Sequence, residues 1–420
     1  AADTDVDFFV SGATEFVDQV LAHGAKEVRN RRARRLVAVP LIGAARGGGY
    51  FDAGAIVDAL VPALAAKARE REVDIALVTY REEEFAAAQA ARRMLAVDHE
   101  LWPELSAALR NKARELAGQA VSGKLVVFFG AGIGASSGLP LWRDLLDSLM
   151  DRAGLDDLEA GALRRWSSLD QAQYIEGALW DRNGALLGKE VAALVDQRRF
   201  VNLSVSFLAN LPIEGFITTN YDRLFESASA AIGQPAAVLP YAPSKQARRW
   251  LLKMHGCVDH PDDIVLTRRS YNRYAERNQA LAGIVQAMLI TREMLFIGFS
   301  LGDDNFLRIV DAVREAVHPG GSGSGDVRDP TATRLGTAIL LEPNAVLSRH
   351  WKKELDIVSS GDPGQDVPEA ARRLEIFLDY FAYLTASARH LLEKRFKDVL
   401  RDDERAVADA LRSLEDASKQ

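Results

Sequence analysis

The sequence is poor in cysteine: Cys257 is the single one among 420 residues. One cysteine excludes an internal disulfide framework and any structural zinc site built from cysteine pairs. No apolar run reaches the length that spans a bilayer, and the first residues, AADTDVDFFV, lack the basic start and the apolar core of a secretory signal. These features predict a cytoplasmic protein that does not associate with membranes.

An excess of positive charge is also missing. The formal net charge is −7 and the sequence pI is about 5.7, so the chain as a whole has no electrostatic footprint for nucleic acid. The one basic cluster, Lys26–Arg35 with the sequence KEVRNRRARR, is equally typical of a solvated helix face or of a loop before a strand. We therefore expect no direct binding of nucleic acid.

The chain is long enough to bury a large core and to form more than one domain. Residues 1–100 predict an α/β module, residues 101–380 a larger domain, and residues 381–420 a C-terminal helical tail. In the larger domain, strand and helix patterns alternate along the chain. This alternation predicts the α/β class with a doubly wound parallel sheet, whose ligands bind beyond the carboxyl ends of the strands.

The strand candidates are short apolar runs, as expected for strands buried on both faces of a parallel sheet. They are Arg35–Leu41, Val73–Tyr80, Leu125–Phe129, Gly215–Thr218, Leu252–Met254, Ile264–Thr267, Met294–Gly298 and Thr337–Glu342. Helical spacing of apolar residues is found in Asp52–Arg71, Trp142–Arg152, Lys189–Leu208, Tyr221–Ile232, Ala280–Arg292 and Asp304–Val317, and two more helices are expected between Glu82 and Gly123. The composition of His318–Pro330, HPGGSGSGDVRDP, predicts a loop.

The stretch Lys124–Arg143, KLVVFFGAGIGASSGLPLWR, joins a buried strand to a glycine-rich turn. Gly130, Ala131 and Gly132 follow the strand at once, and small residues there let backbone amides approach a diphosphate. Many parallel α/β domains turn tightly at this point for packing reasons alone. Taken by itself, the motif leaves both interpretations open.

Further polar motifs also follow strand candidates: TTNYD at Thr218–Asp222, KMHG at Lys253–Gly256 and IGFSL at Ile297–Leu301. Because the carboxyl ends of parallel strands meet at one edge, these residues are expected to converge with the glycine turn on one ligand.

Each polar residue of these motifs also has a structural explanation. Asn220 could cap a helix, His255 could be a satisfied loop histidine, and Asp222 could be an acid in the first turn of a helix.

In this order, GAGI with SGLPLWR, then TTNYD, HG and GFSL, the motifs resemble those of the sirtuin superfamily: GAGIS with SGIPDFR, then QNID, HG and GTSL. The resemblance covers about half of the chain. It implies a sirtuin-like variant of the Rossmann fold that binds NAD, with His255 and Asn220 as catalytic residues. The NAD-binding residues that it implies are Gly130, Ala131, Gly132, Ser137, Trp142, Arg143, Asp222, Gly298, Ser300 and Asn344.

Departures from the family pattern refine this expectation. Gly134 stands where the family usually has Ser, Leu141 replaces Asp, Trp142 replaces Phe, and Thr219 replaces Gln. Paired CxxC motifs are missing, so the zinc module of the protein-deacylating sirtuins cannot form and no metal is expected. The sequence is instead similar to bacterial sirtuin-like NAD hydrolases of antiphage defence.

The resemblance therefore implies cleavage of NAD to nicotinamide and ADP-ribose. A zinc-free deacylase or ADP-ribosyltransferase, or a protein that senses NAD or ADP-ribose without turnover, are the alternatives. Defence relatives are often coupled to a partner such as a HerA-type ATPase or a short Argonaute complex, and the resemblance implies such a partner here.

Both terminal regions carry weaker signals. The segment VAVPLIGAARGGGYFDAGAIVDAL loosely resembles the later half of a macro domain, whose glycine-rich loop wraps a phosphate of ADP-ribose, although a loop with several glycines is also a common flexible turn. After Asp362, the sequence EAARRLEIFLDYFAYLTASARHLL has an apolar helical face. It can pack on its own domain or join subunits, and we expect a homo-oligomer.

Overall fold

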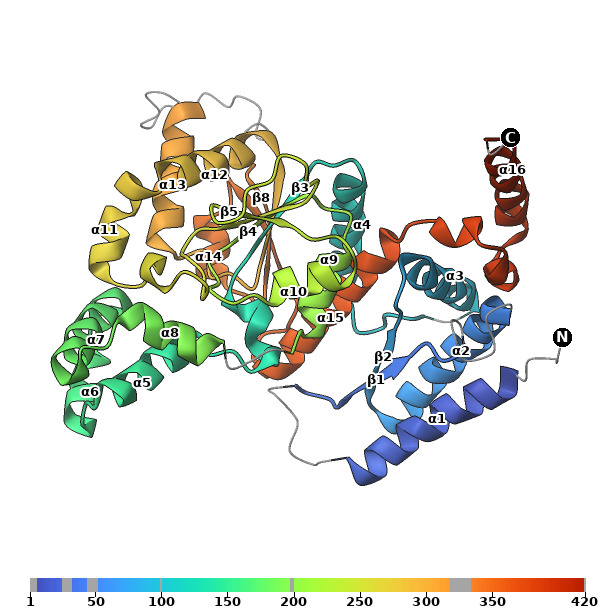
Figure 1. The fold of residues 1–420 in the computed structure, drawn as a ribbon, viewed down its shortest axis with the longest axis horizontal. Coiled ribbons are helices and arrows are strands. Elements are labelled where there is room, and N and C mark those ends of the chain that lie inside the picture. The colour runs from blue at the N-terminus through green and yellow to red at the C-terminus, as the bar shows by residue number, and fades with distance from the viewer. Residues whose placement is uncertain are drawn as a thin grey trace. The chain divides into compact units, whose positions relative to one another are not determined.

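The computed structural model describes residues 6–24, 32–43, 52–98, 100–196, 200–317 and 334–418. It divides into two compact units: Ala1–Glu104 together with Ala382–Gln420, and Leu105–Phe381 (Figure 1). The predicted tail is residues 381–420, and this part of the chain clusters with the first unit from Ala382 onward. Within the described part of the chain, no helix is long and apolar enough to cross a membrane.

The first unit is a βαβ element surrounded by helices. Strands β1 and β2 pair in parallel, with Val37 opposite Ile75, and helix α2 connects them. Its elements are α1 (Val6–His23), β1 (Leu36–Pro40), α2 (Ala53–Arg71), β2 (Asp74–Val78), α3 (Glu82–Asp98), η4 (Arg389–Leu392), η5 (Lys394–Val399) and α16 (Asp402–Ser418). The glycine-rich loop that resembles a macro domain, residues 44–51, lies outside the described residues.

The last elements of the chain close the core of this first unit. Phe396 and Val399 of η5 pack with Ala53, Val57 and Ala87 in one buried cluster. The approach is close, because a Cβ atom on Gly54 would lie 3.0 Å from the carbonyl oxygen of Arg395. Arg395 also pairs with Glu84 at 3.5 Å, and both side chains are buried. Residues of η5 are therefore part of the core of this unit.

The second unit contains a seven-stranded, all-parallel sheet with the order β5-β6-β4-β3-β7-β8-β9. From β6 to β9 this is the order of a Rossmann fold, in which the chain reverses direction across the sheet between β3 and β7. The predicted fold class is confirmed. The strands are β3 (Leu125–Phe129), β4 (Gly215–Thr218), β5 (Ala237–Leu239), β6 (Trp250–Lys253), β7 (Glu293–Ile297), β8 (Gly336–Leu340) and β9 (Leu355–Ser359).

Helices cover both faces of this sheet (Figure 1). Phe128 and Phe296 pack with Phe306 and other residues of the helices that follow β6 and β7, whereas Phe129 and Phe216 contact Phe225 of α10 on the other face. The helices are α4 (Ala107–Val121), η2 (Ala131–Ser137), α5 (Trp142–Ala153), α6 (Asp157–Leu163), α7 (Ser168–Asn183), α8 (Leu187–Val195), α9 (Leu203–Asn210), α10 (Leu224–Ala231), η3 (Pro261–Asp263), α11 (Arg268–Arg277), α12 (Gln279–Thr291), α13 (Asp304–Val317), α14 (Ala345–His350) and α15 (Val367–Leu384).

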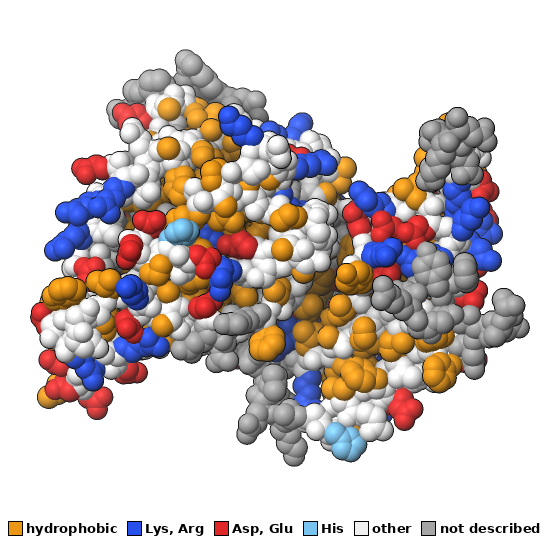
Figure 2. Space-filling view, in the orientation of Figure 1, with side chains coloured by type: hydrophobic (Ala, Val, Ile, Leu, Met, Phe, Trp, Pro, Cys, Tyr) orange, Lys and Arg blue, Asp and Glu red, His pale blue; other side chains and the backbone are white. Residues whose placement is uncertain are grey.

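Most predicted elements are present, with two corrections. Ile264–Thr267 is not a strand, and the helix predicted for Lys189–Leu208 is two helices, α8 and α9. The loop predicted for His318–Pro330 lies outside the described residues. Helices α5–α8 form a separate group beside the sheet (Figure 1), and the face in Figure 2 carries interspersed acidic and basic side chains.

Candidate functional site

The glycine turn after β3 lies against the end of β7. The amide of Gly130 donates to the carbonyl of Ile297 at 3.1 Å, and that of Gly132 donates to the carbonyl of Gly298 at 3.0 Å. A Cβ atom on Gly130 would lie 2.6 Å from the Gly298 oxygen, and one on Gly132 would lie 2.9 Å from its Cα atom. Glycine is therefore required here for packing, at the position where a Rossmann fold binds its ligand.

Asn220 is held against this turn by a chain of hydrogen bonds. Thr218 at the end of β4 donates from its hydroxyl to the carbonyl of Phe129 at 2.9 Å and accepts from the amide of Asn220 at 3.0 Å. The Asn220 side chain donates from Nδ2 to the carbonyl of Gly130 at 3.2 Å. Its Oδ1 atom is buried and has no hydrogen-bond partner in the part of the chain that the structure describes.

Asn220 is thus not a helix cap. Helix α10 begins at Leu224, and the amide of Leu224 donates to Oδ1 of Asp222 at 2.9 Å. Lys253, at the end of β6, is buried, donates from Nζ to the carbonyl of Asp222 and pairs with Glu226 at 2.8 Å. The loop that carries Asn220 is therefore fixed to β3 and to β6.

His255 follows β6 and is 2% exposed. Its carbonyl accepts from the amide of Val265 at 2.9 Å. Its ring makes T-shaped contacts with the rings of Tyr271 and Tyr274, at centroid distances of 5.3 and 5.9 Å. The Nε2 atom lies 3.6 Å from Oδ1 of Asp303 and has no hydrogen-bond partner among the described residues. His255 is not a satisfied loop histidine.

The charge state of His255 follows from this burial. Burial lowers the pKa of the imidazole, and the carboxylate of Asp303 opposes that effect in part. The ring is therefore neutral near neutral pH and can accept a proton.

The loop after β7 has an unusual backbone. Gly298 has a φ of 60° and Leu301 a φ of 59°, in the left-handed region that a leucine seldom adopts. Between them lies the exposed Ser300, whose hydroxyl accepts from the amide of Gly302 at 3.4 Å. Such backbone strain is often found at functional sites.

A cavity of about 660 Å³ lies at these strand ends, within the range of small-molecule sites. Of the predicted site residues, it is lined by Ala131, Gly132, Trp142, Asn220, Asp222, His255, Gly298 and Ser300. The remaining predicted residues are not among its lining. The carbonyl of Gly130 accepts from the side chain of Asn220, Ser137 is buried, and Arg143 is exposed. Asn344 is exposed and caps α14 by accepting from the amide of Leu347 at 2.9 Å.

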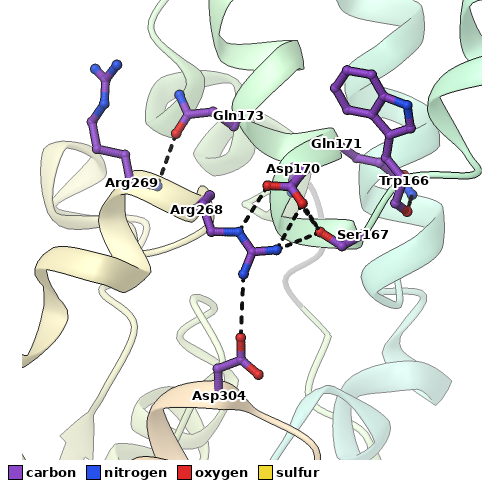
Figure 3. Close-up of polar contacts among 8 residues, drawn as sticks. All are labelled: Trp166, Ser167, Asp170, Gln171, Gln173, Arg268, Arg269 and Asp304. Atoms are coloured by element: carbon purple, nitrogen blue, oxygen red, sulfur yellow. Dashed lines mark hydrogen bonds and ion pairs between the residues drawn. The ribbon is translucent and has the colours of Figure 1, made fainter.

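The helical group α5–α8 contributes residues to the lining of this cavity. Arg268, the first residue of α11, donates to Asp170 of α7 at 3.0 and 2.9 Å and to Ser167 at 2.7 Å (Figure 3). It also lies 3.8 Å from Asp304 at the start of α13. The Arg268 guanidinium and then the Ser167 hydroxyl lower the pKa of Asp170 to about 2, so the pair stays charged at neutral pH.

The predicted residues did not include several groups of this site. Asp303, Arg268 and Leu139 line the cavity. Asp303 follows the motif IGFSL, which ends at Leu301, and lies just outside it. Arg268 gives no local signal, because its partner Asp170 lies in a different helix. Across the described ranges, no group of His, Cys, Asp and Glu is arranged to hold a metal ion.

Comparison with known proteins agrees with this geometry. Residues 214–321 match the family described as SIR2-like domain. NAD(+) hydrolase ThsA of Bacillus cereus (strain MSX-D12) is 32% identical over 198 residues, which is 45% of this chain and 40% of that protein. NAD(+) hydrolase ThsA of Enterococcus faecium is 31% identical over 201 residues, or 46% and 40% of the two chains.

A more distant relative has a different name. Defense-associated sirtuin 2 of Bacillus subtilis is 25% identical over 210 residues, which is 48% of this chain and 20% of that protein. The chain thus spans less than half the length of these relatives. The predicted resemblance to sirtuins is confirmed, because residues 214–321 are similar to the SIR2-like domain.

Proposed function

We propose that the cavity binds NAD and hydrolyses the bond between nicotinamide and ribose. The observation that carries this proposal is that Asn220 and His255 line the same cavity. Each has a buried side-chain atom without a hydrogen-bond partner in the described chain, Oδ1 of Asn220 and Nε2 of His255. Relatives named NAD(+) hydrolase support it. No metal is part of the proposal.

The chemistry needs a positioned water and a proton acceptor. The C1′–N bond breaks and its electron pair leaves with nicotinamide, while the oxygen of water bonds to C1′. The Asn220 amide can orient that water without changing its charge, and neutral His255 can accept the proton that water or a ribose hydroxyl loses. The glycine turn at Ala131 and Gly132 offers small residues for close approach of the diphosphate.

Incubation with NAD alone tests this proposal. We expect equal amounts of nicotinamide and ADP-ribose, measured by chromatography over a range of protein concentrations, and no product from His255→Ala protein. Turnover that starts only when an acylated peptide or an acceptor protein is added would instead show a deacylase or a transferase. Tight NAD binding without nicotinamide release would show a sensor.

We also propose that the protein acts in defence by depleting NAD, as the name of the relative from Bacillus subtilis suggests. A cytoplasmic location goes with this role, because the NAD pool is there. Expression in cells should lower their NAD content, and His255→Ala should not. A partner such as an ATPase or an Argonaute-type protein remains part of this proposal, and copurification from infected cells would test it.

Self-association is a further part of the proposal. Val407, Leu411 and Leu414 are exposed on α16 at helical spacing, so they form one apolar stripe that a second copy could cover. Mass measurement in solution should give a multiple of 46.0 kDa. A monomer at micromolar concentration would contradict it.

A further inference from the structure

Asp303 is a cavity residue whose two carboxylate oxygens have different neighbours. Its Oδ2 atom accepts from the hydroxyl of Tyr271 at 2.7 Å. Its Oδ1 atom accepts from the amide of Phe306 at 2.9 Å and lies 3.6 Å from Nε2 of His255. The side chain is 11% exposed. The carboxylate is therefore fixed from two sides and faces the imidazole from a third.

Asp303 is the charged group that acts on the imidazole ring of His255, as the groups around that ring show. Tyr271 and Tyr274 of α11 and Tyr221 of the β4 loop are neutral, and burial followed by the charge of Asp303 raises the pKa of each hydroxyl. Other charged groups lining the same cavity are Asp222, Arg268 and Asp304, and Arg268 lies 3.8 Å from Asp304. Among all of these, Asp303 alone changes the pKa of His255.

A carboxylate at this place can select one form of the ring. An acceptor beside Nε2 favours the tautomer that carries its proton there, which leaves Nδ1 as the proton acceptor. When the ring gains a second proton, the same carboxylate stabilises the imidazolium in an environment of low polarity. A displacement of well under 1 Å would shorten the 3.6 Å separation to a hydrogen bond.

We propose that Asp303 is a positioning residue for His255, holding the imidazole in its proton-accepting tautomer, and that Tyr271 in turn fixes the carboxylate. This inference rests on the proposed NAD hydrolysis. Asp303 makes no bond to the reacting atoms in this scheme. The proton passes from water to His255 and then to solvent.

The substitution Asp303→Asn removes the charge and keeps the size of the side chain. Asparagine has one oxygen, which can still accept from the amide of Phe306, whereas the nitrogen that replaces Oδ2 can only donate to the oxygen of Tyr271. The Tyr271→Phe variant measures the loss of the tyrosine hydrogen bond by itself. We expect kcat for nicotinamide release to fall at least about tenfold while KM for NAD stays near the wild-type value. The acid limb of the pH profile should move to lower pH, since the carboxylate that holds a proton on His255 is gone. An unchanged kcat, or an acid limb that does not move, would overturn the proposal.

Two further variants separate positioning from folding. Asp311→Asn on α13, the helix that Asp303 precedes, is the matched control, because Asp311 is 69% exposed and pairs with Arg314. Its kcat and pH profile should equal those of the wild type. Tyr271→Phe removes the 2.7 Å hydrogen bond but keeps the charge. It should lower kcat by a few fold without moving the acid limb, and wild-type kcat in this variant would overturn the role of Tyr271.

A titration of His255 without NAD distinguishes this inference from the proposed function. The chain has seven histidines, and the nuclear magnetic resonance signal lost in His255→Gln identifies the ring. The pKa of His255 should be lower in Asp303→Asn than in the wild type, and equal values would overturn the pairing. A wild-type protein that never releases nicotinamide but shows this difference would overturn NAD hydrolysis alone. Should Asp303→Asn fail to fold, the same titration in Asp303→Glu, where the charge is kept, should match the wild type.

Discussion

At the scale of single residues, the site is marked by hydrogen-bonding capacity that the described part of the protein leaves unused. Oδ1 of Asn220 and Nε2 of His255 are buried without a partner there. A buried polar atom in this state costs about 1–3 kcal/mol of folding free energy. Such a cost at Oδ1 of Asn220, in a residue that lines the cavity, is the expected signature of a site whose ligand supplies the missing partner.

The first prediction concerns Asn220. The substitution Asn220→Ala removes the amide that would orient the attacking water and also the bond to the carbonyl of Gly130. We expect nicotinamide release to fall by about 100-fold or more, with a far smaller change in melting temperature. Chromatographic rates and calorimetry measure the two effects.

An asparagine remote from the cavity provides the control for this measurement. Asn210 is exposed at the end of α9 and donates to the carbonyl of Ser206 at 2.9 Å. Asn210→Ala should turn over NAD at the wild-type rate. Equal rates in Asn220→Ala and Asn210→Ala would remove Asn220 from the mechanism.

The second prediction concerns pH. Burial lowers the pKa of His255, so the ring stays neutral below its ordinary value of about 6.5. If the neutral ring is the base, kcat/KM should hold as pH falls through 6.5 and decline only as pH passes the lowered value. Initial rates between pH 4.5 and 8 test the sign, and an acid limb centred above about 6.5 would contradict it.

The residues of the cavity were predictable where a motif follows a strand. Gly132, Asn220 and His255 lie at the ends of strands whose apolar runs are plain in the sequence. Asp303 and Arg268 were not assigned a role, because their function depends on partners far along the chain. Their contacts with His255 and Asp170 exist only after α7, α11 and α13 have packed.

At the scale of secondary-structure elements, the site depends on how closely β3 and β7 end beside each other. The third prediction is that Gly130→Ala destabilises the second unit by about 1–3 kcal/mol. Its Cβ atom would lie 2.6 Å from the Gly298 oxygen, so one of the two loops must move. Denaturant unfolding measures the change, and NAD turnover should fall with it.

Gly134→Ala is the matched control for this prediction. A Cβ atom there would meet the terminal methyl group of Leu139 at 2.8 Å, and a flexible side chain can move where a backbone cannot. Unfolding of Gly134→Ala should stay within about 1 kcal/mol of the wild type. An equal loss of unfolding free energy in both variants would show that the close contact between the loops after β3 and β7 is not what makes Gly130 necessary.

The incorrectly predicted elements have a common physical cause. Ile264–Thr267 is apolar and β-branched, and Val265 and Leu266 are buried as strand residues would be. Its backbone groups, however, bond to the site: the amide of Val265 to the carbonyl of His255, and its carbonyl to the hydroxyl of Tyr221. Burial can be read from composition, but the choice of hydrogen-bond partner cannot.

The second incorrect element shows a signal that the sequence did contain. Asn202 caps α9 by accepting from the amide of Val205 at 2.9 Å, and its Nδ2 atom donates to the carbonyl of Ile133. An asparagine before an apolar run is a common helix start. The continuous helical spacing around it favoured one long helix instead.

At the scale of the whole molecule, each unit has its own core, and the fourth prediction separates them. Phe396 is fully buried in the core of the first unit. Phe396→Ala should destabilise that unit by about 3–5 kcal/mol. Hydrogen exchange should then become faster in α2 and α3, while protection of β3 and β7 is unchanged.

Phe200 is the control for this experiment because its side chain is 83% exposed. Phe200→Ala should leave exchange in both units as it is. Equal loss of protection in β3 and α2 of the Phe396→Ala protein would show that the two units unfold as one cooperative block, contrary to the prediction.

The late closure of the first unit has a consequence for synthesis of the protein on the ribosome. Its core needs Phe396 and Arg395, which are made only after all of Leu105–Phe381 has been translated. At about 5–20 residues per second this delay is on the order of tens of seconds. The nascent chain therefore completes the seven-stranded sheet first, while the apolar surfaces of α2 and α3 stay exposed and can bind a chaperone.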